Sequence, residues 1–525
     1  MRPSFLIRLL VVLLLPWFGA VAAQTLVYGL SGLPASLDAA DSQDGNSLTV
    51  SSSITETLVG FEAGSTQLTP KLATSWRPNE DADAWTFDLR EDVTFHDGTA
   101  FDAEAVKFNF DRWNVVDHPF AFRDEGKSYV PFGWVFGGPA AEGGILAGVD
   151  VVDTHTVRFR LTQPMPFMPT LLAAVYFQIN SPAAVRAAGL DYGTPGVGSV
   201  GTGPFVFSSW QEGDNIRAVR NEDYWNGPAG VEEVVFRGIR ESTSRVAELR
   251  AGAIDIAVDL APDELVTIEG DPALEKVISE ADLNVGYLAM HQDNEPFGDV
   301  RVRRAIAHAI DREAIVEAFF GGLGVTAQDH LPPSVFGHGE PWPYDYDPER
   351  ARELLAEAGY PDGFETELWY MPVSRPYYPA PQPIAEAMAS YLADVGVTVE
   401  LLTEDWTTYL SDYNTGAFPM YMLGWYADYA DPDNFLNTFF GGTAPAEFGW
   451  DAPEVRAWLN EARQITDRDE RAELYAQVND AVAEQAVSIP MGHNRTLNAV
   501  RTSVEGYVAS PLGYSAVSLH PVTKD

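Results

Sequence analysis

Two segments in the first third of the chain alternate apolar and polar residues. They are "WTFDLREDVTFHDG" (85–98) and "VVDTHTVRFRLTQP" (151–164). A repeat of two residues is typical of a β-strand that buries one face and exposes the other. The pattern therefore predicts a strand in each segment.

Residues 299–322, "DVRVRRAIAHAIDREAIVEAFFGG", carry a helical pattern. Asp299 stands where its side chain can cap the first turn, because aspartate accepts hydrogen bonds from free N–H groups there. Ile306 and Ile310 are four residues apart and would share one face of the helix. We expect helix here, with that face packed inward.

A second helix is predicted in "YDPERARELLAEAGYP" (346–361), where both ends are marked. Asp347 is expected to be the cap and Pro348 to occupy the first helical position. Gly359 should end the helix, and Pro361 prevents its continuation. Strands and helices mixed over this length predict an α/β architecture of two or three domains.

The first 23 residues have the layout of a secretory signal peptide. Arg2 and Arg8 provide the positive start, an apolar run follows, and Ala23 ends a stretch of small residues. The apolar run is shorter than the ~20 residues that a membrane span requires. We expect cleavage before Gln24 and export. Since the 525 residues include no cysteine, neither a disulfide nor a lipid-anchoring cysteine is expected, which favours the periplasm.

The net charge is −43, from 33 basic and 76 acidic residues. Such a surface repels nucleic acid and anionic lipid, so neither is expected as a partner. The acidic residues are dispersed along the chain, which indicates a solvated acidic surface.

Motifs of the common enzyme classes are absent. The sequence has no HExxH pair, no GxSxG elbow and no GxxxxGK[ST] loop. Gly196, Gly198 and Gly201 match a dinucleotide-binding spacing, but Pro204 and a strand-like "FVF" follow where a helix should open, so a glycine-rich connection is expected. His96 and Asp97 lie in "FHDG", a turn between strands. We expect no enzyme, no cofactor and no metal site.

"GWYADYADPDNF" (424–435) places three carboxylates, those of Asp428, Asp431 and Asp433, among aromatic residues. From the residues alone this stretch is compatible with a metal site, an acid/base pair, a pocket for a cation or a solvated loop. Asp431 followed by Pro432 is typical of a helix start with a capping aspartate. The spacing of a calcium-binding loop is missing. We therefore expect Asp431 and Asp433 to have structural roles.

Six segments, taken together and in order, resemble one family: the periplasmic solute-binding proteins of peptide and nickel ABC transporters, known as family 5. They are residues 68–112, "GTGPF" (201–205), "NEPFGDVRVRRAIAHAIDREAIV" (294–316), "YDPERARELLAEAGYPDGF" (346–364), "MPVSRPYYP" (371–379) and "GWYADYADPDNF". The resemblance is greatest to the dipeptide-binding branch and covers nearly the whole mature chain.

The resemblance implies a periplasmic binding protein fold of type II (cluster C): two α/β lobes joined by a hinge, with an additional domain inserted in the first lobe. The hinge strands are expected near 284–293 and 488–494. The implied limits are 1–23 for the signal peptide, 24–60 and 196–283 for lobe I, 61–195 for the inserted domain, 284–490 for lobe II, and 491–525 for the C-terminal part of lobe I.

The resemblance also implies a function. A dipeptide would lie in the cleft between the lobes, and a monomeric binding protein would deliver it to an inner-membrane permease. By similarity, Arg375 would bind the ligand carboxylate and Asp428 the ligand ammonium. Trp425, Tyr426 and Tyr377 would line pockets for side chains.

One cationic and one anionic side chain are what a dipeptide, which carries both charges, requires in a closed cleft. A closed cleft removes water from both charges of a zwitterion, so each needs a partner of opposite sign. Arginine can meet a carboxylate through two parallel hydrogen bonds. Other ligands bound by members of this family remain alternatives: longer peptides, glutathione, haem or nickel chelates. A rival of another class is a secreted hydrolase that uses Asp428 and Asp431 as a carboxylate pair.

Overall fold

The computed structural model describes residues 24–279, 282–442, 444–513 and 518–525. The expected signal peptide, residues 1–23, lies outside these ranges. Within them, every helix is too short or too polar to span a lipid bilayer.

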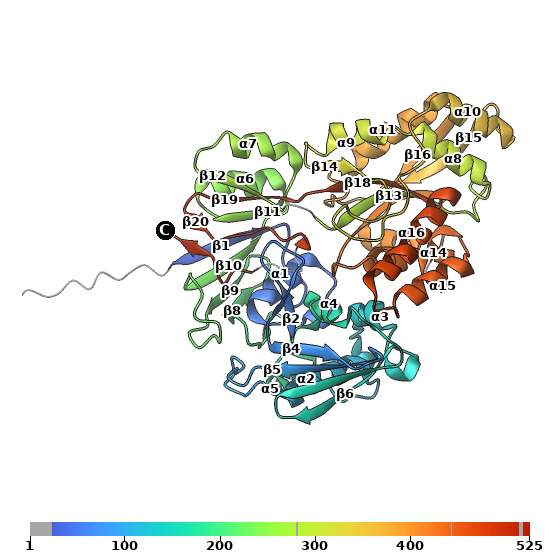
Figure 1. Ribbon diagram of the computed structural model, residues 1–525. Helices are drawn as coiled ribbons and strands as arrows, with labels where there is room; N and C mark the ends of the chain where they lie inside the picture. The colour runs from blue at the N-terminus through green and yellow to red at the C-terminus, as the bar shows by residue number, and fades with distance from the viewer. Residues whose placement is uncertain (1–23, 280–281, 443, 514–517) are drawn as a thin grey trace, which may run out of the picture.

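Three sheets organise the molecule (Figure 1). The seven-stranded sheet has the order β12 (Leu274–Ile278), β19 (Leu497–Arg501), β11 (Ile256–Leu260), β1 (Thr25–Leu30), β10 (Glu233–Gly238), β9 (Asn215–Arg220) and β8 (Phe205–Gln211). The six-stranded sheet has the order β14 (Gly324–Thr326), β18 (Ser488–Asn494), β13 (Asn284–Met290), β17 (Met420–Tyr426), β15 (Phe364–Trp369) and β16 (Val397–Leu402). We call the parts built on these sheets the seven-stranded lobe and the six-stranded lobe.

A four-stranded antiparallel sheet lies below the other two in Figure 1 and forms what we call the lower subdomain. Its order is β4 (Ala73–Pro78), β5 (Ala84–Leu89), β7 (Thr156–Leu161) and β6 (Leu146–Asp153). Buried and less buried side chains alternate in β5 and β7, which confirms both strands predicted from the period of two. Two short ribbons complete the sheets: β2 (Val59–Phe61) with β3 (Leu68–Pro70), and β20 (Val504–Glu505) with β21 (Thr523–Lys524).

Sixteen α-helices occur in the described residues. They are α1 (Gly45–Ile54), α2 (Ala103–Asn114), α3 (Val130–Phe136), α4 (Met168–Leu172), α5 (Pro182–Ala188), α6 (Ser242–Ala251), α7 (Leu265–Glu269), α8 (Val300–Ala309), α9 (Arg312–Phe319), α10 (Pro348–Glu357), α11 (Pro381–Asp394), α12 (Trp406–Tyr413), α13 (Asp433–Phe440), α14 (Ala444–Phe448), α15 (Pro453–Ala462) and α16 (Arg468–Gln485). Short 3-10 turns connect several of them, including η4 (Val175–Phe177).

The predicted helix ends are confirmed with one revision. The side chain of Asp299 accepts the N–H of Arg301, and that of Asp347 accepts the N–H of Arg350. The segment that begins at Asp299 forms two helices, however, because the chain is extended at Ile310 and Asp311 caps α9. Ile310 is still almost completely buried.

The glycine-rich segment before β8 is a connection, as expected. No helix opens at Gly201, whose missing side chain leaves room for the backbone of α1: a Cβ atom there would lie 2.5 Å from the carbonyl oxygen of Ile54. Asp97, in the "FHDG" turn, accepts hydrogen bonds from Thr99 and from Ser181.

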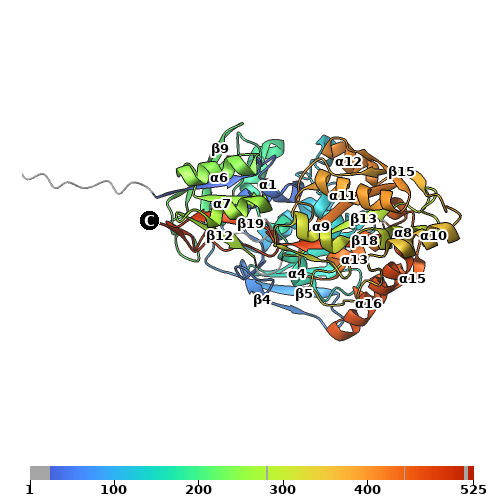
Figure 2. The ribbon, with the colours of Figure 1, turned by 90° about the horizontal axis from the view of Figure 1, so that it is seen from above.

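The chain passes between the two large sheets twice. It leaves the seven-stranded sheet after β12 to enter the six-stranded sheet at β13, and it returns between β18 and β19 (Figures 1 and 2). Strands β13 and β18 are buried along their whole length, and they pair with each other. The segments expected to carry the hinge are thus two neighbouring central strands next to these passages. The domain limits given above stay a proposal.

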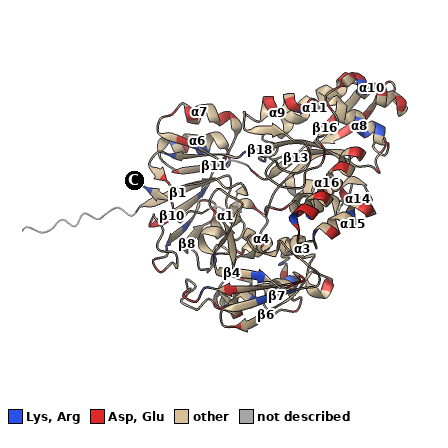
Figure 3. Ribbon diagram, in the orientation of Figure 1, with Lys and Arg blue, Asp and Glu red and all other residues tan. Residues whose placement is uncertain are grey.

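One hydrophobic core runs through the six-stranded lobe and the lower subdomain. Two other cores lie against the seven-stranded sheet. Acidic residues occur on helices throughout the molecule, in agreement with a dispersed acidic surface (Figure 3).

Candidate functional site

The stretch from Gly424 to Phe435 joins the end of strand β17 to helix α13. In β17, all side chains except that of Trp425 are buried. Asn434, in the first turn of α13, fixes the loop, since its Oδ1 accepts the backbone N–H of Asp428 at 2.8 Å and the indole N–H of Trp425 at 3.2 Å. The loop is therefore tied to the helix that follows it.

Asp431 and Asp433 both form buried ion pairs with arginines of neighbouring helices. Arg471 of α16 donates to the two carboxylate oxygens of Asp431 at 2.7 and 2.9 Å. Arg463, just after α15, lies 3.0 Å from Asp433. Asp431 also accepts the N–H of Asp433 at 3.0 Å, so α13 begins at Asp433, one residue later than the expected start at Pro432. Both acids connect the loop to the helices behind it.

Asp428 is different. Its side chain is 5 % exposed, and its Oδ1 accepts a hydrogen bond from the hydroxyl of Tyr176 at 2.8 Å. No lysine or arginine in the described part of the chain forms an ion pair with it. Burial raises the pKa of Asp428 to about 6, opposed by its hydrogen bonds with Tyr176 and Asn434. The site thus holds a desolvated carboxyl group to which the described residues offer no cationic partner.

Aromatic rings surround this carboxyl group. The ring of Trp134, from α3, lies edge-on to Tyr176 and to Trp425, with centroid distances of 6.2 and 6.0 Å. Trp134 is 46 % exposed, so part of its surface is open to a ligand. Aromatic faces attract cations. The surroundings of Asp428 therefore suit a positively charged group.

Sequence reasoning missed Tyr176 and Trp134. Both belong to the part of the chain that builds the lower subdomain, about 250 to 300 residues before Asp428. Tyr176 lies in an apolar run and Trp134 between phenylalanines and glycines, so no local pattern distinguishes them from core residues. Only the tertiary fold brings them to the carboxyl group.

Arg375 lies in a short hairpin. Its N–H donates to the carbonyl of Tyr378 at 3.1 Å, and the N–H of Tyr378 donates back at 2.9 Å. The hairpin packs where Gly286 and Gly424 pair on adjacent strands. A Cβ atom at Gly424 would lie 2.3 Å from the ring of Tyr377, and one at Gly286 would lie 2.5 Å from its carbonyl oxygen. Because Gly286 and Gly424 have no side chains, the hairpin that carries Arg375 can pack directly on strands β13 and β17, close to the loop that carries Asp428.

The guanidinium of Arg375 is half-buried, and in the described residues it has no carboxylate at ion-pair distance. It lies over the ring of Trp406, 5.1 Å from the centroid, and donates to the carbonyl of Ser374 at 3.3 Å. It also interacts with the hydroxyl of Tyr377, whose side chain is buried beside it. Arg375 is therefore held in place while its charge stays available to an anion.

Tyr426 faces the passages between the sheets. Its hydroxyl interacts with Asp282 and Thr496, which stand on the two passages. Thr496 donates to Asp282 from its backbone N–H and its hydroxyl, both at 2.6 Å, and burial raises the pKa of Asp282 to about 6. Tyr426 therefore interacts with both passages between the lobes.

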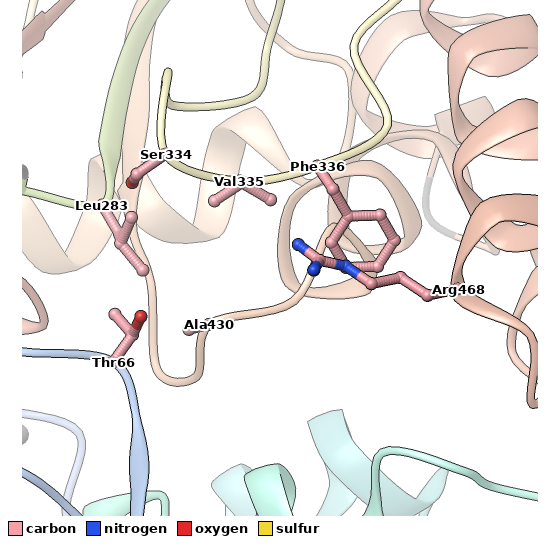
Figure 4. Close-up of a pocket in the computed structure, with 7 residues that line it drawn as sticks. All are labelled: Thr66, Leu283, Ser334, Val335, Phe336, Ala430 and Arg468. Atoms are coloured by element: carbon pink, nitrogen blue, oxygen red, sulfur yellow. The ribbon is translucent and has the colours of Figure 1, made fainter.

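A cavity of about 210 Å³ opens beside the aspartate loop (Figure 4). It is lined by Thr66, Leu283, Ser334, Val335, Phe336, Ala430 and Arg468. Thr66, in the turn between β2 and β3, meets residues of the six-stranded lobe here, and Arg468 lies over the ring of Phe336, 4.6 Å from its centroid. None of the five predicted site residues lines this cavity. Ala430, two residues after Asp428, is the member of the aspartate loop that lines it.

Comparison with known proteins gives consistent matches. A family model described as "Bacterial extracellular solute-binding proteins, family 5 Middle" matches residues 67–447. Heme-binding protein A of Haemophilus influenzae is 34% identical over 506 residues, covering 94% of this chain and 91% of the relative. Dipeptide-binding protein of Escherichia coli K12 is 33% identical over 513 residues, covering 94% of each chain.

Solved structures agree. The dipeptide binding protein of Pseudoalteromonas sp. SM9913 in complex with Met-Leu superposes with a TM-score of 0.85. It shares 28% identity, over 96% of this chain and 100% of the other. The described fold therefore extends to nearly the full length of these proteins.

Proposed function

Because the chain belongs to the bacterial extracellular solute-binding proteins of family 5, we propose that it is the periplasmic component of an ABC importer that binds dipeptides between its lobes. A dipeptide would be held at its carboxylate by Arg375 and at its ammonium by Asp428. The loaded protein would then deliver it to a membrane permease.

The observation that carries this proposal is the contrast within one loop. Asp431 and Asp433 are neutralised by arginines, whereas Asp428, equally buried, has no cation within the described residues. A buried ion without a partner is costly. A ligand ammonium would supply the missing charge, and Arg375 offers the complementary charge for a carboxylate. One site for each sign fits a zwitterion.

Lobe closure would complete the site. The bond from Tyr176 to Asp428 joins the lower subdomain to the six-stranded lobe, so the ammonium pocket has walls from both sides of the cleft. Trp425, Tyr377 and Trp134 would line it. Tyr426 would act through the passages between the lobes rather than by contacting the ligand side chains.

Haem is the second candidate, because one relative is named a heme-binding protein. Haem carries two propionates and no ammonium, so it would leave Asp428 without a partner. The dipeptide therefore fits better. The rival hydrolase loses support as well, since both oxygens of Asp431 are engaged by Arg471. The proposal includes no catalytic step, and we propose a monomer that matures by cleavage before Gln24.

Calorimetric titration of the purified protein with dipeptides, tripeptides, glutathione and haem tests the function. Dipeptides should bind most tightly, and Arg375→Ala and Asp428→Ala should each weaken binding by ~3 kcal/mol or more. Asp81→Asn, an exposed change in the turn between β4 and β5, is a control that should bind as the wild type does. Absence of dipeptide binding, or turnover of labelled peptide, would contradict the proposal.

A further inference from the structure

Asp259 interrupts a buried strand in the seven-stranded lobe. In β11 its side chain is exposed, while its neighbours Val258 and Leu260 are buried. The pairing of β11 with β19 shifts register between Ala257 and Leu260. A bulge of this kind turns a side chain out of the alternation of its strand, and such bulges are frequent next to functional sites.

The backbone of Asp259 is held in the left-handed region, with φ at +52°. This conformation is unfavourable for most residues other than glycine and is retained where the surroundings enforce it. Two side chains do so here: the amide oxygen of Asn498 accepts the N–H of Asp259 at 3.1 Å, and Arg245 donates to its carbonyl at 2.8 Å. The direction of the side chain is therefore fixed before any ligand arrives.

Asp259 lies at the end of β11 beside the passages between the lobes, because its neighbour Leu260 pairs with Leu497, the first residue of β19. Its charge interacts with that of Arg375 in the six-stranded lobe, and within its own lobe it interacts with Ser31. Desolvation raises the pKa of Asp259, opposed by Arg245 and Arg375. The exposed side chain, its place at the end of β11 and its interaction with Arg375 together indicate that Asp259 borders the same cleft as the proposed carboxylate anchor.

The arginines near Asp259 do not neutralise it by direct contact. Neither Arg245 nor Arg375 forms an ion pair with it among the described residues. The N–H groups of Arg245 are directed at the carbonyl groups of Ile239, Arg240, Val258 and Asp259. The cleft thus presents two carboxylates, Asp259 and Asp428, for one guanidinium. A neutral dipeptide leaves one of these negative charges without a partner.

We propose that Asp259 is a second anionic anchor, which binds the cationic side chain of the ligand residue that carries the carboxylate. Dipeptides with lysine or arginine in the second position would then be the preferred ligands. We assign the cationic side chain to the second residue of the dipeptide because that residue carries the carboxylate proposed to bind Arg375, and Asp259 interacts with Arg375 and not with Asp428. The inference rests on the proposed function and narrows its ligand class.

Titration with Ala-Lys, Ala-Gln and Lys-Ala tests it in the wild type and in Asp259→Asn. The wild type should bind Ala-Lys about tenfold more tightly than Ala-Gln, because a desolvated charge pair forms. Asp259→Asn should abolish that preference and leave the affinity for Ala-Gln within about threefold, since Arg375 and Asp428 remain. Lys-Ala should respond less than Ala-Lys. Asp81→Asn, which changes the net charge equally, should keep the preference.

The outcomes separate the two proposals. If Ala-Gln and Ala-Lys bind with equal affinity to the wild type, or if Asp259→Asn keeps the preference, the second anchor is wrong while dipeptide binding stands. If Asp259→Asn tightens binding of Ala-Gln, Asp259 competes with the ligand for Arg375 and the second anchor is also wrong. If no dipeptide binds the wild type, both proposals fail.

Discussion

Within six residues the chain carries three aspartates in two different environments. Asp431 and Asp433 are buried against arginines from α16 and the end of α15, and they connect a loop to its helices. Asp428 is buried among aromatic rings with a tyrosine hydroxyl as its donor. The same side chain thus stabilises the fold where it is paired, and is available for binding where it is not.

Removal of an arginine from the paired region should have the largest effect. Arg471→Met keeps much of the packing against Phe167 and Phe336 but leaves Asp431 buried without a cation. The free energy of unfolding should fall by about 3–5 kcal/mol, as found when one partner of a buried pair is removed. Urea unfolding followed by tryptophan fluorescence measures this. The double variant with Asp431→Asn should recover part of the loss, and a loss below about 1 kcal/mol would mean that the pair is not important for stability.

Removal of the charge of Asp428 should lower ligand affinity and leave stability intact, the opposite of the effect expected for Arg471→Met. Asp428→Asn keeps an acceptor for Tyr176 but removes the charge that a ligand ammonium needs. Dipeptide affinity should fall by ~3 kcal/mol, whereas the free energy of unfolding at pH 7 should stay the same or rise, because a buried charge is lost. Calorimetric titration and urea unfolding on one preparation give both values. A stability loss like that of Arg471→Met would show that Asp428 is structural after all.

The pH dependence should sharpen the comparison further. Burial raises the pKa of Asp428 to about 6 in the folded, ligand-free protein. At a pH below the pKa of this carboxyl group in the unfolded chain, the raised pKa stabilises the folded state, and this stabilisation is lost as the pH rises through 6. Binding of an ammonium has the opposite sign, because it needs the ionised carboxylate.

Dipeptide affinity should therefore fall below pH 6, at the limit by roughly tenfold per pH unit. Calorimetric titrations in steps of about half a pH unit, from about pH 7.5 down to about pH 4.5, near the ordinary pKa of a carboxyl group, measure this fall in affinity. Burial raises the pKa of Asp282 to about 6 as well, so the wild type must be compared with Asp428→Asn, whose residual affinity should vary much less. Equal slopes for the two proteins would assign the proton to another group.

The sequence predicts those features whose interacting residues lie close together along the chain. The caps at Asp299 and Asp347, the strands β5 and β7 and the structural role of Asp431 follow from local patterns, which act within a few residues.

Other features depend on tertiary contacts. The arginine partners of Asp431 and Asp433 lie 30 or more residues away, and Tyr176 reaches Asp428 from the lower subdomain. The bulge that turns Asp259 into the cleft depends on its pairing with β19, and no local pattern signals it. Such features become visible only once the lobes are assembled.

The smallest expected effect tests the link between the lower subdomain and the unpaired aspartate. Tyr176→Phe removes the hydroxyl that donates to Asp428 while keeping the ring beside Trp134. Dipeptide affinity should fall by about 1 kcal/mol, since one hydrogen bond to a charged group is lost, and the midpoint of the pH dependence should move upward because the ionised carboxylate loses a donor.

Tyr129→Phe provides a matched control, because its hydroxyl donates to the carbonyl of Ala121 elsewhere in the same subdomain. That change should lower stability without moving the midpoint. If the two variants alter affinity and midpoint equally, the lower subdomain acts on binding through its general stability rather than through Asp428. If only Tyr176→Phe moves the midpoint, the contact from Tyr176 adjusts the charge of Asp428, the aspartate of this loop that has no arginine partner among the described residues.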